Sequence, residues 1–388
     1  MKFAHLADCH VGGWKDENLR ELTIQAFERS INNCISEHID FMLIAGDLFD
    51  SAMPSIDVLK RVTHSLRELK ERDIPVYVIH GSHDYSVSGK TMLDVLEKAG
   101  LLTNVSKFRE GKLRFTTDKT GVKITGLPGK RNSLEVEDFK KLDRASLEAE
   151  EGFKIFMFHT GIEEFKPTDL QKVKCTPMEY FPKGFNYYAG GHIHYVFEKE
   201  FYKGKLSFPG PLFPEDIREL ETLKQGNYNI VEVEGGSILI KHYPVMLRET
   251  ASFTFNVNDK DPEQIKNMIL YTVSDVDNKI VILRLEGKMN GRPSHIDFKK
   301  IYSQLGIPYT ILRNTSKLVS EEFDQTEINL GDVKDIETKI LDSYKDKVDT
   351  DLVKNLVHSL DKEREEGEKV GDYEASIILE ARKVLNLE

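Results

Sequence analysis

The chain has 388 residues, of which 39% are hydrophobic and 31% are charged, and its formal net charge is −11. This composition is typical of a globular protein with two or three domains, and it excludes a membrane-spanning chain, because no apolar run approaches the roughly 20 residues that a bilayer requires. The net charge of −11 argues against nucleic-acid binding through overall charge, although bound metal ions would add positive charge locally.

Strands and helices alternate along the first hundred residues. Apolar runs predict buried strands at residues 2–7, 39–45 and 75–80. Helical spacing of apolar residues predicts helices at residues 18–37, 55–72 and 92–99. This order predicts α/β layering with a mostly parallel sheet. Further strands are predicted at residues 153–158, 187–190, 196–201, 205–208, 228–233 and 238–243. Glycine-containing turns between them favour a second sheet that packs on the first.

The pattern restarts near residue 246. A strand-helix-strand-helix-strand unit is predicted at residues 251–257, 262–271, 279–285, 295–305 and 308–313. From residue 332 the chain lacks strand signals, is rich in charge and carries apolar residues on one side of three helical stretches. We therefore predict three domains, at 1–245, 246–331 and 332–388.

Two simple features bear on location. The N-terminal residues indicate a strand and contain no basic start followed by an apolar signal segment. The three cysteines are too few and too scattered for a disulfide framework. We expect a cytoplasmic protein without membrane association, which would be associated with the nucleoid in a prokaryote.

Five short polar motifs each follow a predicted strand. They are Asp8-Cys9-His10, Gly46-Asp47, Gly81-Ser82-His83-Asp84, His159-Thr160-Gly161 and Gly191-His192-Ile193-His194. In α/β sheets ligands bind at the carboxyl ends of strands, and residues two apart can point to the same side. Mixed carboxylate and imidazole ligands suit manganese, iron or zinc better than calcium or magnesium. Six such converging groups predict two metal ions, about 3.5–4 Å apart, that activate water for attack on phosphorus.

His83 and Asp84 stand apart from this ligand set. We predict that His83 faces the scissile phosphate and acts on the leaving oxygen, and that Asp84 orients its ring. A single histidine at a strand end is usually structural. The joint order of five motifs, each at a strand end, is what favours a catalytic site over coincidence.

This series of motifs resembles the calcineurin-like metallophosphoesterase superfamily. Three runs resemble the SbcD-type nucleases, which include the archaeal and eukaryotic meiotic-recombination nuclease; they are Gly46-Asp47-Leu48-Phe49, His159-Thr160-Gly161-Ile162 and Phe208-Pro209-Gly210-Pro211. The resemblance covers residues 1–245 by motif and the remainder by architecture. It implies an α/β fold, in which a two-sheet metallophosphoesterase sandwich flanked by helices precedes a small α/β capping domain and a helical C-terminal tail.

The resemblance also implies which residues bind metal. One ion would be held by Asp8, His10, Asp47 and His194, the other by Asp47, Ser82, His159 and His192, and His83 would be the catalytic histidine. The family usually has Asn where Ser82 stands; a hydroxyl reaches less far than an amide, so we expect the second ion to be held more loosely. Some members have His where this chain has Asp50, which leaves the role of position 50 open, a helix N-terminal feature being one interpretation.

The function implied is a manganese-dependent DNA exonuclease and endonuclease, with two Mn²⁺ per chain, that processes DNA ends in double-strand-break repair. A small-molecule or protein phosphoesterase and a catalytically weakened DNA-binding scaffold remain the alternatives. The implied partners are single- and double-stranded DNA ends, a second copy of the chain, and an SbcC-type coiled-coil ABC ATPase that binds 332–388. Candidate DNA contacts are Lys15, Arg20, Lys130, Arg131 and Arg292. Candidate dimer contacts are Leu19, Leu22, Phe27 and residues 53–69.

Overall fold

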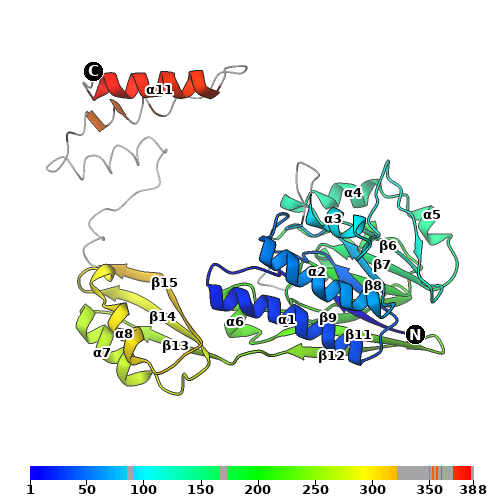
Figure 1. Ribbon diagram of the computed structural model, residues 1–388, viewed down its shortest axis with the longest axis horizontal. Coiled ribbons are helices and arrows are strands. Elements are labelled where there is room, and N and C mark those ends of the chain that lie inside the picture. Colours follow the sequence, from blue (N-terminus) through cyan, green and yellow to red (C-terminus); the bar gives the residue numbers. More distant parts are fainter. Residues whose placement is uncertain are drawn as a thin grey trace. The chain divides into compact units, whose positions relative to one another are not determined.

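The structure is a computed structural model, and it describes residues 1–84, 91–166, 173–320, 349, 352–353, 355–356, 360 and 370–385. Two six-stranded sheets form its main body (Figure 1). The first contains, in spatial order, β12 (Ser237–Val245), β11 (Gly226–Glu234), β1 (Lys2–Leu6), β2 (Phe41–Ala45), β3 (Val76–Ile79) and β4 (Thr103–Asn104). The run from β1 to β4 is parallel, whereas β11 and β12 are antiparallel to their neighbours.

The second sheet repeats this plan. Its spatial order is β5 (Thr116–Thr117), β6 (Lys123–Leu127), β7 (Lys154–His159), β8 (Tyr187–Gly191), β10 (Gly204–Phe208) and β9 (Phe197–Phe201). Strands β6, β7, β8 and β10 are parallel, and the edge strands β5 and β9 are antiparallel. Parallel strands end at a common edge, so each sheet gathers its strand-end loops on one side.

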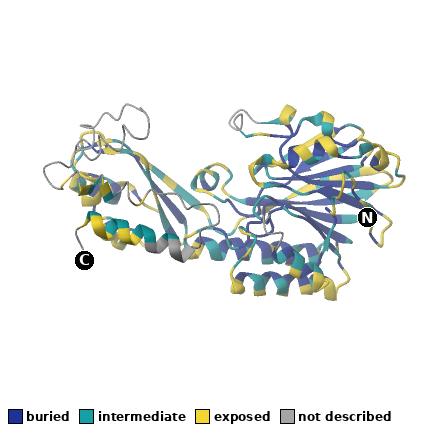
Figure 2. Ribbon diagram, turned by 90° about the horizontal axis from the view of Figure 1, so that it is seen from above, coloured by how far each residue is buried: buried dark blue, intermediate teal, exposed yellow. Residues whose placement is uncertain are grey.

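The two sheets pack face to face because alternate strand residues point to opposite faces. In β2, Phe41, Leu43 and Ala45 contribute to the core between the sheets, while Met42 and Ile44 belong to the core on the outer face. The outer core of the second sheet is rich in aromatic side chains and includes Phe139, Phe156, Phe158, Phe181 and Phe208. Both sheets are largely buried (Figure 2).

Helices cover the outer faces. The longest are α1 (Glu17–Ser36) and α2 (Ile56–Glu71), which lie side by side and whose first turns are capped by Asp16 and Ser55. The shorter helices of this body are α3 (Met92–Lys98), α4 (Glu135–Lys141), α5 (Arg144–Glu148) and α6 (Ile217–Thr222). Short 3₁₀ turns occur at Arg131–Ser133, Glu163–Phe165 and Met178–Tyr180.

A third, three-stranded sheet follows. It contains β13 (Thr250–Asn256), β14 (Ile280–Met289) and β15 (Thr310–Ser320), with helices α7 (Pro262–Thr272) and α8 (Phe298–Gln304) and the 3₁₀ turn Pro293–His295 between them. Contacts divide the chain into two units, one of residues 1–257, 263–287 and 296–318, the other of 258–262, 288–295 and 319–388. The domain boundaries at 245 and 331 stay predictions.

The C-terminal prediction is described only in part. Residues 370–384 form the helix α11 (Val370–Val384), where helical spacing was expected, and on it Ile378 and Leu379 are exposed. Residues 332–348 and 361–369 lie outside the described residues. Within the described part, no helix has the length and apolarity needed to cross a bilayer.

The α/β sandwich with helices on both faces confirms the predicted fold class. The strands β4, β5 and β6 and the helices α4, α5 and α6 were not predicted. Strand β6 was not predicted because Gly126 interrupts its apolar run. Glycine is required at this position because a Cβ would lie 2.4 Å from the carbonyl oxygen of Met157 in the neighbouring strand. Strand β15 continues seven residues beyond the expected end at 313, through a polar stretch without apolar alternation.

Candidate active site

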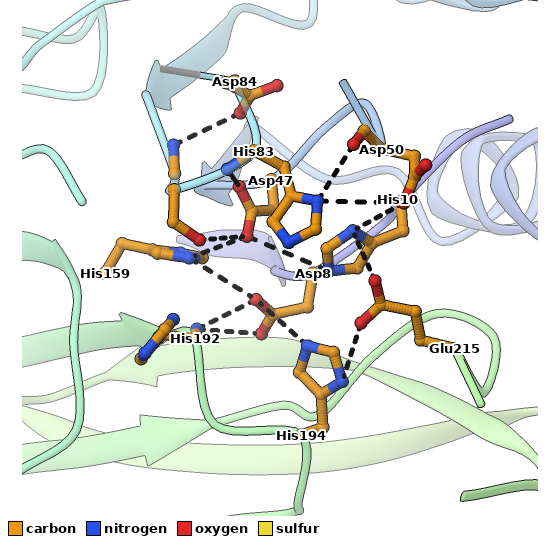
Figure 3. A network of polar contacts seen from close by, with 12 residues as sticks. Asp8, His10, Asp47, Asp50, His83, Asp84, His159, His192, His194 and Glu215 are labelled. Carbon is orange, nitrogen blue, oxygen red and sulfur yellow. Dashed lines mark hydrogen bonds and ion pairs between the residues drawn. The ribbon is translucent and has the colours of Figure 1, made fainter. Parts of the chain in front are cut away.

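The predicted motifs meet where the carboxyl ends of the parallel strands of the two sheets lie next to each other (Figure 3). Asp8 and His10 follow β1, Asp47 follows β2, Ser82 and His83 follow β3. His159 ends β7, and His192 and His194 follow β8. The loop after β1 is joined to the loop after β2 by backbone hydrogen bonds, in which the N–H groups of Asp8, His10 and Val11 donate to the carbonyls of Gly46, Asp47 and Leu48 at 3.2, 3.0 and 3.0 Å.

These loops hold unusual backbone conformations. Asp8, His10 and Asp47 have φ of 49°, 39° and 50°, in the left-handed region that non-glycine residues rarely adopt. Two glycines, Gly46 before Asp47 and Gly191 before His192, are required by close approach. A Cβ on Gly46, which has φ of 89°, would lie 2.2 Å from Nδ1 of His159, and a Cβ on Gly191 would lie 2.1 Å from the carbonyl oxygen of Ala45. The backbone therefore strains to bring the polar side chains together.

Three overlapping groups of side chains in the described part of the chain have the spacing of metal ligands, with the ligand atoms of each group within 4.8 Å of one another. They are Asp8, His10 and His194; Asp8, Asp47 and His159; and His10, Asp50, His83 and Glu215. Asp8 is common to the first two. Asp47 also reaches both, because its Oδ2 lies 2.9 Å from Nε2 of His159 and 3.9 Å from Nε2 of His10.

The hydrogen bonds of the His159 and His10 rings indicate which of their nitrogens are available to bind a cation. Nδ1 of His159 lies 2.8 Å from the carbonyl oxygen of Ala45 and must donate to it, which leaves Nε2 facing Asp47. Nε2 of His159 and both ring nitrogens of His10 are buried without a hydrogen-bond partner in the described chain. Orphaned nitrogens beside carboxylates require a shared cation, either a proton or a metal ion. The residues present thus fit divalent metal ions.

Charge in the site shifts the pKa values accordingly. Burial opposes protonation of His159 and His194, yet Asp47 and Asp8 raise the pKa of His159 to about 9, and Glu219 and Asp8 raise the pKa of His194 to about 10. Burial alone would raise the pKa of Asp47, but His159, His10 and His83 hold it far below its usual range. The site therefore attracts positive charge, as a metal centre must.

Two predicted ligands, Ser82 and His192, are not in the groups with metal-ligand spacing. The hydroxyl of Ser82 donates to Oδ2 of Asp47 at 3.3 Å. His192 belongs to none of the three groups found among the described residues. Its backbone N–H donates to both carboxylate oxygens of Asp8, at 2.9 and 3.1 Å, and its ring lies against that of His159, with centroids 5.1 Å apart. Burial and the neighbouring His159 lower the pKa of His192 to about 4, which leaves the ring neutral.

His83 lies at the mouth of the site and is half-exposed. Its backbone N–H donates to Oδ1 of Asp47 at 2.7 Å, and its ring Nδ1 lies 2.9 Å from the carbonyl oxygen of Asp50. The expectation that Asp84 orients this ring was wrong. The Asp84 carboxylate accepts the backbone N–H groups of Leu48, Phe49 and Gly81 and so fixes the loop that carries Asp47.

Asp50 takes the place expected of Asp84. Its side chain lies 3.7 Å from Nδ1 of His10 and 3.8 Å from Nδ1 of His83. It is not a helix N-terminal residue, since Ser55 caps α2. The carbonyl of residue 50 cannot be recognised as a histidine partner from the sequence, because backbone groups carry no residue-type signal.

Two glutamates at the site were missed altogether. Glu215 lies 3.6 Å from Nδ1 of both His10 and His194, and Glu219 lies 2.8 Å from Nδ1 of His194. The available signal was their position just after the Phe208–Pro211 run and the short amphipathic helix α6. The site opens into a cleft of about 670 Å³. Its lining includes His10, Asp47, Ser82, His83, His192, His194, Tyr195, Glu215, Arg218, Glu219 and Leu223.

The five residues that were predicted to contact DNA differ in their exposure and in the groups that they contact. Lys130 follows Gly129, which approaches His159 closely, but it forms an ion pair with Asp138 at 2.5 Å. Arg20 hydrogen-bonds the carbonyls of Trp14 and Lys15 at 3.1 and 3.3 Å, so it supports the loop after His10. Lys15 and Arg131 are exposed. Arg292 lies in the second unit. None of the five lines the cleft.

The comparisons with known proteins agree with this geometry. Residues 1–196 match the calcineurin-like phosphoesterase family. Three archaeal relatives are each named "DNA double-strand break repair protein Mre11". The protein of Methanocaldococcus jannaschii is 28% identical over 375 residues, which are 93% of this chain and 94% of the relative. That of Archaeoglobus fulgidus is 24% identical over 382 residues, 92% and 84%. That of Methanococcus maripaludis is 34% identical over 207 residues, 50% and 52%.

Proposed function

The chain belongs to the calcineurin-like phosphoesterase family and is a metal-dependent hydrolase of phosphoester bonds, and from this premise we propose that it is a DNA nuclease of double-strand-break repair. The observation that carries the proposal is the pair of overlapping ligand groups around Asp8 and Asp47 at the base of an open cleft. The names of the relatives that span more than nine-tenths of the chain supply the substrate class.

We propose two ions, one held by Asp8, His10, Asp47 and His194 and the other by Asp47, His159, His192 and Ser82. When bound, such a pair activates a water and neutralises charge on the phosphate. Mixed oxygen and imidazole ligands suit manganese, iron or zinc, and we propose manganese from the resemblance to the SbcD-type nucleases. Asp84 keeps the Asp47 loop in place, and His83, half-exposed at the mouth, supplies a proton donor for the leaving oxygen.

The test compares substrates under one metal condition. Purified full-length chain with Mn²⁺ should cleave single-stranded DNA, and Asp47→Ala should abolish that cleavage, which excludes a contaminating nuclease. Hydrolysis of a chromogenic phosphate monoester without cleavage of DNA would instead identify the alternative, a small-molecule phosphoesterase. Full metal content with neither activity would identify a binding scaffold.

We propose a homodimer, with a correction to the surface expected from sequence. Leu19, Leu22 and Phe27 are completely buried in the core and cannot contact a second copy. Met53 and Ile56, at the start of the expected range 53–69, are 64% and 73% exposed, so these two apolar side chains are the remaining candidates for the contact. Light scattering at micromolar concentration should give the mass of two chains, and Ile56→Glu should reduce it to one.

The segment 332–388 is proposed to bind an SbcC-type coiled-coil ABC ATPase. The described support is α11, whose Ile378 and Leu379 are exposed by 59% and 56%. Apolar helix residues need a partner surface. Deleting 332–388 should leave metal-dependent cleavage of short single-stranded DNA intact and abolish co-purification with the ATPase. A truncated chain that still binds the ATPase as tightly as the full chain would rule this out.

A further inference from the structure

One carboxylate lies between two histidines of the same proposed ion site (Figure 3). Oε1 of Glu215 is 3.6 Å from Nδ1 of His10, and its other oxygen, Oε2, is 3.6 Å from Nδ1 of His194. Glu219 adds a hydrogen bond of 2.8 Å to Nδ1 of His194. The second ligand group is supported differently, because Nδ1 of His159 donates to the carbonyl of Ala45.

We propose that Glu215 is a positioning residue shared by His10 and His194, and that it makes the ion site of these two histidines the tighter of the two. The inference rests on the proposed two-ion centre, but it does not depend on DNA being the substrate. Glu215 also belongs, with His10, Asp50 and His83, to a group whose spacing would suit a metal ion. We assign it a positioning role because its oxygens face the Nδ1 atoms, whereas Nε2 of His10 approaches Asp47 and Nε2 of His194 approaches Asp8.

The chemistry of imidazole gives the reason. A ring that offers the Nε2 lone pair to an ion keeps its proton on Nδ1, and a carboxylate that accepts this proton fixes the ring and makes Nε2 a stronger ligand. Nδ1 of His10 is buried and has no hydrogen-bond partner in the described chain. The carboxylates near enough to accept its proton after a small movement are those of Glu215 and Asp50, at 3.6 and 3.7 Å. The Nδ1 proton of His194 is accepted by Glu219 at 2.8 Å, so Glu215 acts on that ring through its charge and is available as a proton acceptor for His10.

The segment that carries Glu215 is held independently of the histidines. The indole N–H of Trp14 donates to the carbonyl of Pro214 at 2.8 Å, and Asp216 caps α6 by accepting the N–H of Glu219 at 2.7 Å. Leu220 is buried in the main core, and Glu221 forms an ion pair with Arg284 at 2.5 Å. Removing the charge of Glu215 should therefore leave the segment in place.

The experiment is a titration of the metal-free chain of 388 residues with Mn²⁺. Binding is measured by isothermal titration calorimetry and, independently, by the electron paramagnetic resonance signal of free Mn²⁺. Wild type is compared with Glu215→Gln, and with Glu200→Gln as a matched control, because Glu200 is an exposed strand residue paired with Lys205. Unfolding of each variant in EDTA checks that the fold is kept. We expect Glu215→Gln to weaken one of two binding steps by about 10- to 100-fold and leave the other within about twofold.

A double-mutant cycle shows whether Glu215 acts through the histidines. In a His194→Ala, His10→Ala background, Glu215→Gln should cause no further loss of affinity. Equal weakening of both steps, unchanged affinities, or an additive loss in that background would overturn the proposal. Three ions in wild type and two in Glu215→Gln would also overturn it, since Glu215 would then be a ligand. A wild-type chain that binds no Mn²⁺ would refute the two-ion centre itself.

Discussion

Nε2 of His159 lies 2.9 Å from Oδ2 of Asp47, and both side chains are buried, 1% and 2% exposed. Because Nδ1 of His159 donates to the carbonyl of Ala45, the nitrogen that faces Asp47 can only accept unless a second proton or a metal ion binds there. This contact between the two sheets defines the centre of the site, and the predictions below start from it.

Asp47→Ala should remove both ions and all phosphodiester hydrolysis. The Asp47 carboxylate approaches His159 and His10 and also accepts the backbone N–H of His83, so no neighbouring group replaces it. Metal analysis by mass spectrometry after desalting and a DNA cleavage assay measure the two effects. Cleavage at the wild-type rate would show that Asp47 is not the shared ligand.

His83→Ala should keep both ions and DNA binding but slow cleavage by about 10²–10⁴-fold, the usual contribution of an acid–base group. The ring is half-exposed at the mouth and contacts the carbonyl oxygen of Asp50 through Nδ1. His83 belongs to neither of the two groups around Asp8, although it lies at ligand spacing from His10, Asp50 and Glu215. Single-turnover cleavage with measured Mn²⁺ content checks this. Loss of metal from the variant would make His83 a ligand instead.

Ser82→Asn should raise the apparent Mn²⁺ affinity of the weaker binding step. The Ser82 hydroxyl hydrogen-bonds Asp47, whereas an amide oxygen extends farther and is a good ligand for a hard cation. A Mn²⁺ titration of the variant beside wild type provides the measurement. If the two titration curves coincide, the serine already supplies what this site requires.

Metal affinity should rise with pH. In the metal-free chain the pKa values of His159 and His194 are raised to about 9 and about 10, so both rings carry an additional proton at pH 7. Binding of ions to Nε2 must release these protons, and higher pH therefore favours the bound state. Affinity should increase about tenfold per pH unit for each proton released, between pH 6.5 and 8.5. Calorimetry in two buffers of different ionisation enthalpy counts the protons, and a pH-independent affinity would contradict the prediction.

His5 should make folding less stable in acid. Its Nδ1 contacts the Tyr187 hydroxyl at 2.9 Å, its Nε2 has no hydrogen-bond partner among the described residues, and burial lowers its pKa from 6.5 to about 3. Below pH 6.5 the unfolded chain binds a proton that the folded chain refuses, so stability is lost as pH falls from 6.5 toward 3, by up to about 1.4 kcal/mol per unit.

The comparison uses urea unfolding in EDTA at pH 7 and pH 5. The wild-type free energy of unfolding should drop by about 1–2 kcal/mol more than that of His5→Gln, in which the titrating group is absent. Comparing the drops removes any constant offset between the two proteins. Equal drops would show that His5 is protonated in the folded state or reached by water.

The sequence by itself predicted that Asp8, His10, Asp47 and His159 lie together. Each of these residues follows or ends a short apolar strand, and parallel strands must bring their carboxyl ends to one edge. The spacing of Asp8 and His10, and the glycine at 46, are local properties that sequence states directly. The α/β sandwich followed from the same alternation of apolar runs.

Only the tertiary structure decided which groups contact these residues and the neighbouring His83 and His194. Glu215 and Glu219 meet His194 through a loop and a short helix without periodic signal, and the ring of His83 meets Asp50 where Asp84 was expected. The tertiary structure also decided that Leu19 is buried. Helical spacing alone is compatible with Leu19 facing either a core or a second chain. Local patterns determine which side of an element is apolar, whereas the contacts between loops depend on how both sheets pack, and no short window of sequence contains that information.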